Sequence, residues 1–311
     1  MTEEKHNDNR PRYVSLDGCE MIGEGKHGRV YLLNDEQIIK VYYDGTASDQ
    51  IELERRNGRS AFIQGVPSCI TFDLVETDLG EGIVFELAGG KPLGTYISEH
   101  PEELEINAEK IADLITDLHR AKASPSEFDS AKNFYTESYR SIPEKYLSLR
   151  EVEKLIRIIN AVPDCDCFIH TDLHTQNIMI NDKKELMLID MAEITSGHPI
   201  FDLGSTYMTM VFSPKLSSKL GREITGLSKK QAKRVWDIVI RRYCKTEDKD
   251  KIARIERLCR YMCYMRLATL IARTSVFSKA AYMLCALWAK VFVLSQAERY
   301  MHAFSSLATP E

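Results

Sequence analysis

The 311-residue chain is 44% apolar and 28% charged, enough to bury the core of one large domain or two small ones. It has no apolar run of the roughly 18 residues that cross a bilayer, and its polar opening lacks the apolar stretch of a secretion signal, so we expect a cytoplasmic protein without a membrane partner. With a net charge of −5, no zinc-finger spacing and no basic run interleaved with aromatics, we expect no nucleic-acid partner either.

The first part of the sequence predicts β-strands followed by one helix. Short runs rich in Ile, Val, Tyr and Phe, separated by turn residues, are typical of strands and hairpins. We expect strands near residue 21 and at 29–33, 37–43, 70–76 and 82–87. Between the third and fourth of these, Ser48 is a candidate cap for a helix that Gly65 and Pro67 end.

Beyond the glycine-rich connection at Gly89 and Gly90 the apolar pattern changes its period. Apolar residues three and four positions apart predict a helix over residues 108–120. A strand at 168–170 and a hairpin at 177–190 follow, and after Pro199 the pattern is helical, with segments at 229–243, 250–274 and 278–304. We therefore expect an α+β fold with two lobes, a small β-rich one over residues 1–88 and a larger, mainly helical one over residues 89–311.

Charge and cysteine are unevenly distributed. From residue 213 to 311 the chain carries 20 Lys and Arg against 8 Asp and Glu, so this third holds +12 and the rest −17. A basic segment favours an anionic partner, although charges on helix faces are more commonly only solvated. The eight cysteines include no CxxC pair, and we interpret them as reduced structural thiols. Cys165 and Cys167, which flank Asp166, are a weak candidate for a metal site.

A glycine-rich motif, GEGKHGRV, lies between the first two predicted strands. It contains Gly23, Gly25 and Gly28, and glycines let a backbone lie close over nucleotide phosphates. A dinucleotide-binding turn would need a helix directly after the third glycine, whereas here Val30 begins a β-branched and aromatic run that continues as a strand. The context therefore favours a kinase-like phosphate loop, with a plain glycine-rich hairpin as the structural alternative.

The strand that follows this motif carries a lysine between two apolar residues. Lys40 stands in IIKVYY, where a positioned ammonium can hold the α and β phosphates of a nucleotide. An ammonium in that role needs a carboxylate from the next helix to orient it. Both Glu52 and Glu54 are available there, and the residue pattern leaves the choice between them open.

The strongest signal is FIHTDLHTQNIMI, a short polar loop between two apolar segments. Asp172 is suited to accept the proton of an attacking hydroxyl, and Asn177 to bind magnesium through its amide oxygen. Asp190, at the end of the next apolar strand, adds a second hard oxygen ligand for magnesium. The structural alternative is a capped turn, in which Asp172 and Asn177 bind only backbone groups.

Together these motifs resemble those of the aminoglycoside phosphotransferase and choline kinase family, within the protein kinase-like superfamily. The resemblance covers about residues 19–207 and rests on GEGKHGRV, the Lys40 strand, an LHR ending at Arg120, HTDLHTQN and the LID ending at Asp190. It implies a two-lobed kinase-like fold, ATP and Mg²⁺ as cofactors, and a small-molecule hydroxyl as the acceptor. The N-terminal lobe is then the nucleotide-binding lobe, and the C-terminal lobe holds the catalytic and acceptor-binding residues.

The resemblance also carries individual roles. It favours Glu54 as the partner of Lys40, because Glu54 stands 11 residues before Gly65, a spacing similar to that of the aminoglycoside kinases. It implies that backbone groups near Glu86 and Ala88 recognise the nucleotide base.

Three further polar residues have supporting roles by the same resemblance. His170 is expected to pack beneath the catalytic loop, His174 to support Asp172 or touch phosphate, and Asp202 to brace the loop from a buried position. We expect the tyrosines of residues 124–166 to be packing residues rather than acceptor ligands.

Two departures separate the chain from protein kinases. His174 stands where those enzymes have a lysine, and only 11 residues intervene between Asp190 and Asp202, with no APE motif. So short a segment leaves little room to dock a peptide, which favours an aminoglycoside, amino alcohol, sugar or related metabolite as the acceptor. An atypical protein kinase, a nucleotide-binding regulator without turnover and, least of all, a helical interaction protein are the alternatives.

Overall fold

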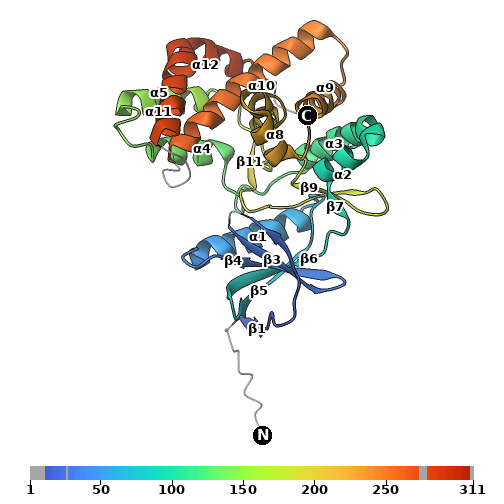
Figure 1. Cartoon of the computed structure of the whole chain (residues 1–311). Helices are drawn as coiled ribbons and strands as arrows, with labels where there is room; N and C mark the ends of the chain where they lie inside the picture. Colours follow the sequence, from blue (N-terminus) through green and yellow to red (C-terminus); the bar gives the residue numbers. More distant parts are fainter. Residues whose placement is uncertain (1–10, 26, 273–278, 309–311) are drawn as a thin grey trace.

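The computed structural model describes residues 11–25, 27–272 and 279–308, which form a β-rich N-terminal lobe and a larger helical lobe (Figure 1). This is the expected α+β architecture. The N-terminal sheet has the strand order β1-β5-β6-β4-β3-β2. Its strands are β1 (Arg12–Val14), β2 (Met21–Glu24), β3 (Gly28–Asn34), β4 (Gln37–Tyr42), β5 (Thr71–Thr77) and β6 (Gly80–Glu86). The sequence pattern missed β1, a short edge strand that pairs in parallel with β5.

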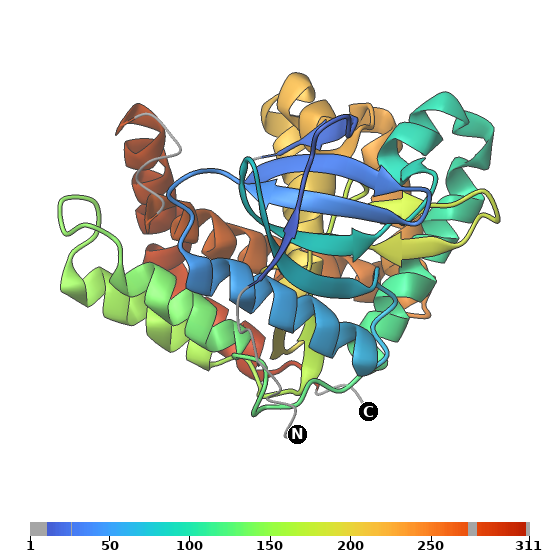
Figure 2. The same ribbon diagram turned by 90° about the horizontal axis from the view of Figure 1, so that it is seen from below.

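Helix α1 (Ser48–Ile63) packs along one face of this sheet (Figure 2). Ile51 on its buried side packs with Ile83 of β6 and Tyr42 of β4. The prediction that Ser48 caps the helix is wrong, because the capping position is Ala47 and no side chain caps the helix there. The hydroxyl of Ser48 instead donates a hydrogen bond to Glu81, 2.7 Å away, and so holds the helix start to the sheet.

The chain passes between the lobes through Gly89 and Gly90 into β7 (Lys91–Pro92), which pairs with a strand of the helical lobe. Gly90 has a φ of +69°, and a Cβ there would stand 1.8 Å from the carbonyl oxygen of Ile180, so only glycine fits. Two small sheets follow, in the orders β10-β9-β7 and β11-β8. Their strands are β8 (Cys167–Ile169), β9 (Ile178–Ile180), β10 (Leu186–Leu188) and β11 (Thr195–Gly197).

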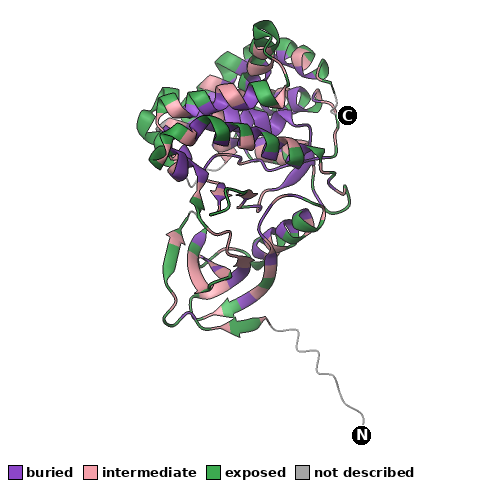
Figure 3. Cartoon of the chain, turned by 90° about the vertical axis from the view of Figure 1, so that its right-hand side faces the viewer, coloured by how far each residue is buried: buried purple, intermediate pink, exposed green. Residues whose placement is uncertain are grey.

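The helical lobe encloses the main hydrophobic core, with Phe168 and Trp236 among its fully buried residues (Figure 3). Tyr135 and Tyr139 are buried in it too, and the hydroxyl of Tyr139 donates to the carbonyl oxygen of Met265 at 2.9 Å, as expected of packing residues. The helices are α2 (Leu93–Glu99), α3 (Leu104–Arg120), α4 (Ala131–Arg140), α5 (Leu149–Asn160), α6 (Ile200–Tyr207), α7 (Ser213–Leu216), α8 (Ser218–Thr225), α9 (Lys229–Tyr243), α10 (Lys249–Thr269), α11 (Lys279–Trp288) and α12 (Ala297–Ser305).

The predicted C-terminal helices agree with the structure only in part. Helix α9 has the expected bounds, but the continuous helix expected over residues 278–304 is wrong, because a π-helical turn (Ala289–Val293) and a 3₁₀ turn (Leu294–Gln296) separate α11 from α12. The π-helical turn contains Val291 and Val293, and β-branched side chains of this kind are stiff in a helix and lower its stability. The predicted boundaries at residues 274 and 278 lie outside the described residues. Over the described ranges, no helix is long and apolar enough to cross a membrane.

Candidate active site

The loop between β8 and β9 is held from below by a buried carboxylate. Asp202, in the first turn of α6, is fully buried and accepts hydrogen bonds from the backbone N–H groups of His170, at 2.8 Å, and Thr171, at 2.7 Å. Its Oδ2 also lies 3.1 Å from Nε2 of His119, whose Nδ1 is 2.8 Å from the hydroxyl of Tyr243. Such a fully satisfied buried network fixes the loop in one conformation.

Thr171 shows how strongly the loop is held. Its φ is +70°, in the left-handed region that a β-branched residue rarely adopts. Besides its bond to Asp202, its carbonyl oxygen accepts from the hydroxyl of Ser205 at 2.8 Å, and its own hydroxyl donates to the carbonyl oxygen of Glu193 at 3.2 Å. The surrounding bonds offset the strain, and the side chain of the next residue, Asp172, is 47% exposed.

Asp172 and His174 face each other across the loop. Nε2 of His174 lies 3.7 Å from Oδ2 of Asp172, while the backbone N–H of Gln176 donates to Nδ1 of His174 at 3.3 Å. That bond leaves the ring proton on Nε2, directed at the carboxylate. Burial alone would raise the pKa of Asp172, but hydrogen bonding from His174, with a further contribution from the guanidinium of Arg266, holds this pKa well below its ordinary value. Asp172 is therefore ionised at neutral pH.

Asn177 and Asp190 come together at neighbouring strand ends. The side-chain amide of Asn177 donates to the carbonyl oxygen of Asp172 at 2.9 Å, which turns its own amide oxygen away from that bond. The backbone carbonyl of Asn177 accepts from Ile189 at 3.0 Å, and Asp190 follows with a φ of +61°. Nε2 of His170 lies 3.0 Å from the carbonyl oxygen of Ile189, so this buried histidine ties the catalytic loop to the segment that carries Asp190.

Lys40 links the two lobes. Its Nζ lies 2.7 Å from Oε1 of Glu54 on α1 and 3.7 Å from Oδ1 of Asp190 in the helical lobe. Glu52 points elsewhere and forms a bidentate pair with Arg55. Of the two carboxylates that the sequence offered, the structure therefore places Glu54 beside the lysine.

The glycine-rich motif forms the hairpin between β2 and β3, closed by a 2.9 Å bond from the N–H of Gly25 to the carbonyl of Gly28; its fourth residue lies outside the described ranges. Val30 pairs with Lys40 across β3 and β4, so both side chains lie on one face of the sheet, and Gly23 pairs with Val30. At Gly28 a Cβ would stand 2.1 Å from the carbonyl oxygen of Val41, so the close packing of β3 on β4 requires a glycine here, whether or not a ligand binds.

Glu86 and Ala88 lie at the end of β6, where the chain leaves the sheet for the helical lobe. The N–H of Ile70 donates a hydrogen bond to Oε2 of Glu86 at 3.0 Å. The carbonyl oxygen of Ile70 accepts a second hydrogen bond from the backbone N–H of Glu86 at 2.9 Å. The side chain of Glu86 is thus used within the sheet. Within the described ranges the N–H of Ala88 donates to no other group, which leaves it available to a ligand.

Arg266 is a residue that sequence reasoning missed. It lies on α10, is 5% exposed, and its guanidinium contacts Glu193 at 3.6 Å and the ring of Phe134 at 4.9 Å. Among the described residues its Nη1 has no hydrogen-bond partner. Because Glu193 also accepts the hydroxyl of Thr171, Arg266 is connected to the loop that holds Asp172. A long helix with several arginines gives no local signal that one of them points inward.

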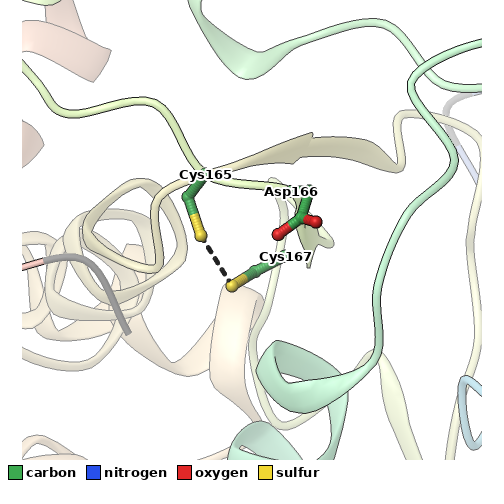
Figure 4. A group of neighbouring side chains, drawn as sticks. All are labelled: Cys165, Asp166 and Cys167. Atoms are coloured by element: carbon green, nitrogen blue, oxygen red, sulfur yellow. Dashed lines mark hydrogen bonds between the residues drawn. The ribbon is translucent and has the colours of Figure 1, made fainter. Parts of the chain in front are cut away.

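A second cluster, away from the catalytic loop, consists of Cys165, Asp166 and Cys167 (Figure 4). The two Sγ atoms point toward one another and lie 2.9 Å apart. The carboxylate of Asp166 is paired with Lys122 at 2.7 Å, and burial raises the pKa of the Cys167 thiol to about 12. Metal ions bind thiolates, so a protonated thiol and a carboxylate already neutralised by lysine make a poor ligand set.

The two-lobed fold, the lysine–glutamate pair and the braced loop together define a kinase-like phosphotransferase. The chain belongs to the phosphotransferase enzyme family (APH), because the sequence model of that family matches residues 18–234, more than two thirds of its length. It is accordingly a small-molecule phosphotransferase. A search of the curated proteins gives no match.

Solved structures of aminoglycoside phosphotransferases share the fold. ADP-bound APH(2'')-Ib has a TM-score of 0.58 at 15% identity, over 92% of this chain and 94% of that one. The gentamicin complex of APH(2")-IIa has a TM-score of 0.58 at 16% identity, over 91% and 93%. APH(3'')-Id from Streptomyces rimosus, with ADP and streptomycin, has a TM-score of 0.50 at 17% identity, over 79% and 92%.

Proposed function

We propose that this phosphotransferase moves the γ-phosphoryl group of ATP to a hydroxyl of a small molecule in the cytosol. The observation that carries the proposal is the line of side chains from Glu54 through Lys40 to Asp190, which crosses between the lobes beside the loop that presents Asp172. A lysine held at 2.7 Å by one carboxylate and 3.7 Å from another is a fixed cation where polyphosphate charge has to be neutralised.

The nucleotide would lie between the glycine-rich hairpin and the helical lobe. Gly23 and Gly25 would approach the phosphates with their backbone, Val30 would contact the base beside Lys40, and the N–H of Ala88 would donate to the base. A Cβ at Gly25 would meet its nearest heavy atom only at 3.9 Å, so this part of the hairpin faces open space where a phosphate can lie. Gly28 contributes by keeping β3 close to β4.

Magnesium fits the donor set at the junction of the lobes. Asn177 offers an amide oxygen and Asp190 a carboxylate that is 44% exposed, and both are hard ligands. When bound there, the ion would neutralise charge on the phosphates. Lys40, 3.7 Å from Asp190, would hold the phosphates from the other side.

Asp172 would position the acceptor hydroxyl. A carboxylate with so low a pKa is a weak base, so it would orient the hydroxyl by accepting a hydrogen bond and receive the proton late, as the bond to phosphorus forms. His174 would keep Asp172 ionised and correctly turned through its Nε2–H. Most of the rate enhancement would then come from alignment and from charge stabilisation of the transferring group.

The acceptor would be an aminoglycoside, an amino alcohol, a sugar or a related metabolite. Aminoglycosides are polycations that bind best among carboxylates, whereas Arg266 places a buried positive charge near the catalytic loop. A neutral or less basic alcohol is therefore the better match to this site.

The test is magnesium-dependent ATP consumption by the purified chain against a panel of aminoglycosides, amino alcohols, sugars and nucleosides. We expect turnover with one acceptor class, reduced by about 10²- to 10⁴-fold in Asp172→Ala. Asp166→Ala, which removes an exposed carboxylate outside the site, is the matched control and should retain activity. Binding of ATP without turnover on any acceptor would instead favour a regulator, and phosphate appearing on protein would favour a protein kinase.

A further inference from the structure

Helices α10 and α12 form a pocket that the phosphotransferase reaction does not use. Its volume is about 230 Å³. Three arginines and one histidine line it, together with Tyr261, Leu258, Ala303 and Ser306. The basic residues come in two pairs, each three residues apart, Arg254 and Arg257 on α10 and Arg299 and His302 on α12. No carboxylate is among the lining residues.

Two arginines of the same lobe have acidic partners that the pocket arginines lack. Between α9 and α3, Arg242 lies 2.8 Å from Asp113, and Arg234 lies 3.0 Å from Glu105. In the described part of the chain, Arg254 and Arg257 form neither a hydrogen bond nor an ion pair. The guanidinium of Arg299 donates a 3.3 Å bond to the amide oxygen of Gln296 and forms no ion pair within the described ranges.

Helix dipoles do not explain the arrangement. His302 lies in the last turn of α12, where the helix dipole favours a cation. Arg254 and Arg257, in contrast, lie in the first half of α10, where the dipole gives a cation no advantage. Like charges around one concavity repel each other, weakly because these side chains are exposed to water, and a bound anion would relieve that repulsion.

The floor of the pocket is rigid and partly aromatic. Tyr261 stacks on Tyr300 at 4.1 Å between ring centroids, which joins α10 to α12, and the guanidinium of Arg299 lies 5.8 Å from the Tyr261 ring. Leu258 is buried beside it. The arginines therefore stand on a fixed base, and their planar groups match the oxygen geometry of a phosphate.

The pocket is separate from the active site. Arg254 precedes Arg266 by 12 residues on one helix, about 18 Å along its axis at 1.5 Å per residue. In Figure 1 both helices lie in the part of the helical lobe turned away from the six-stranded sheet. The basic C-terminal third of the sequence thus gathers part of its excess charge at a site far from the nucleotide.

We propose that this pocket binds a small soluble anion that carries at least two negative charges on phosphate groups. A concave site of this size suits a compact ligand, such as a pyrophosphate or a phosphorylated metabolite. The proposal does not depend on the acceptor or on turnover, because none of its residues belongs to the catalytic loop or to the phosphate-facing hairpin.

The probe is inorganic pyrophosphate, titrated calorimetrically into the full chain. Pyrophosphate also resembles the phosphates of ATP, so all titrations use a Lys40→Met background that weakens the nucleotide site. In this background we expect saturable binding of one pyrophosphate that weakens as salt is raised, with no binding of acetate. Adding Arg257→Ser should weaken the binding at least tenfold, because it removes one charge-assisted contact.

Arg260→Ser is the matched control, since it removes the same charge from an exposed position on the same helix, outside the pocket. We expect Arg260→Ser to change the affinity for pyrophosphate by less than about twofold, because an exposed charge outside the pocket is largely screened by solvent. Equal weakening by Arg257→Ser and Arg260→Ser would overturn the proposal in favour of general attraction to a basic surface. So would the absence of saturable binding in the Lys40→Met background, or binding to phosphatidic acid vesicles without binding to free pyrophosphate.

Discussion

We propose that the loop between β8 and β9 and the glycine-rich hairpin both face the nucleotide, but the two segments are built in opposite ways. The loop is anchored by the fully buried Asp202, and its neighbours His170 and Thr171 are almost fully buried as well. In the hairpin, Glu24, Gly25 and His27 are exposed, and among the described residues the bond from the N–H of Gly25 to the carbonyl of Gly28 closes the turn. One segment is fixed by contacts from distant parts of the chain, whereas the other is held mainly by its own sheet.

The difference corresponds to what each segment has to do. A group that aligns an acceptor hydroxyl has to be fixed to within a fraction of an ångström, so its loop is held even at the cost of a left-handed Thr171. A cover over phosphates has to admit and release a nucleotide, so few buried contacts are an advantage there. Four predictions test this comparison.

We expect the largest effect on stability from removing the carboxylate of Asp202, which holds the loop between β8 and β9. Asp202→Ala would leave two buried backbone N–H groups and His119 without their acceptor, and we expect a loss of about 3–5 kcal/mol in the free energy of unfolding. Asp166→Ala, which breaks an exposed pair with Lys122, should cost less than about 1 kcal/mol. Guanidinium unfolding followed by circular dichroism measures both, and similar losses in the two variants would refute the brace.

Within the hairpin, two glycines should behave differently. Gly28→Ala would place a Cβ 2.1 Å from the backbone of Val41 and lower the free energy of unfolding by about 1–3 kcal/mol. Gly25→Ala meets nothing closer than 3.9 Å, so stability should change by less than about 0.5 kcal/mol while the KM for ATP rises. Thermal melts and ATP titrations separate the two effects. A Gly25→Ala variant with unchanged KM would count against the hairpin as a phosphate cover.

The partner of Lys40 can be tested with two neighbouring glutamates. Glu54→Gln removes the carboxylate that holds the lysine and should raise the KM for ATP about tenfold, the loss of roughly one charged hydrogen bond. Glu52→Gln is the matched control, because its carboxylate pairs with Arg55 instead, and should change the KM less than twofold. If the two variants have the same KM, the ion pair does not position Lys40 for phosphate.

The smallest effect concerns pH. The pKa of Asp172 is depressed, so the acid limb of kcat/KM should lie below the ordinary aspartate value of about 4, where protonation removes the active carboxylate. His174→Ala removes a contribution that lowers this pKa, so the limb should move upward by up to about one pH unit. The control is His100→Ala, a histidine outside the site, near Glu102. A profile that His174→Ala leaves unmoved would show that His174 does not tune Asp172.

Much of the site could be predicted from the sequence because its signals are local. The catalytic loop, with Asp172 and Asn177, lies between two short apolar strands that the pattern found. The hairpin that leads to Asp190 was equally visible. Helix α9 was predicted with the correct bounds from its apolar pattern, and the structure adds a capping box of Ser228 and Gln231 at its start, a signal contained in four consecutive residues.

Local residue patterns alone could not predict contacts between segments that lie far apart in the sequence. Glu52 and Glu54 are two positions apart, so they point to different sides of one helix, and only the docking of α1 on the sheet decides which one meets Lys40. The turn of Arg266 toward the loop and the pairing of β1 with β5 likewise depend on packing partners far away in the chain.

By itself, the sequence determined the motifs, most of the N-terminal strands, several helices, and the residue types available for phosphate, magnesium and a hydroxyl, because spacing and apolar period are properties of a few adjacent residues. Only the tertiary structure decided which carboxylate orients the lysine, how Asp202 fixes the loop, and where the basic C-terminal residues gather. Those depend on contacts whose free energy is gained only when segments far apart in the chain pack against each other.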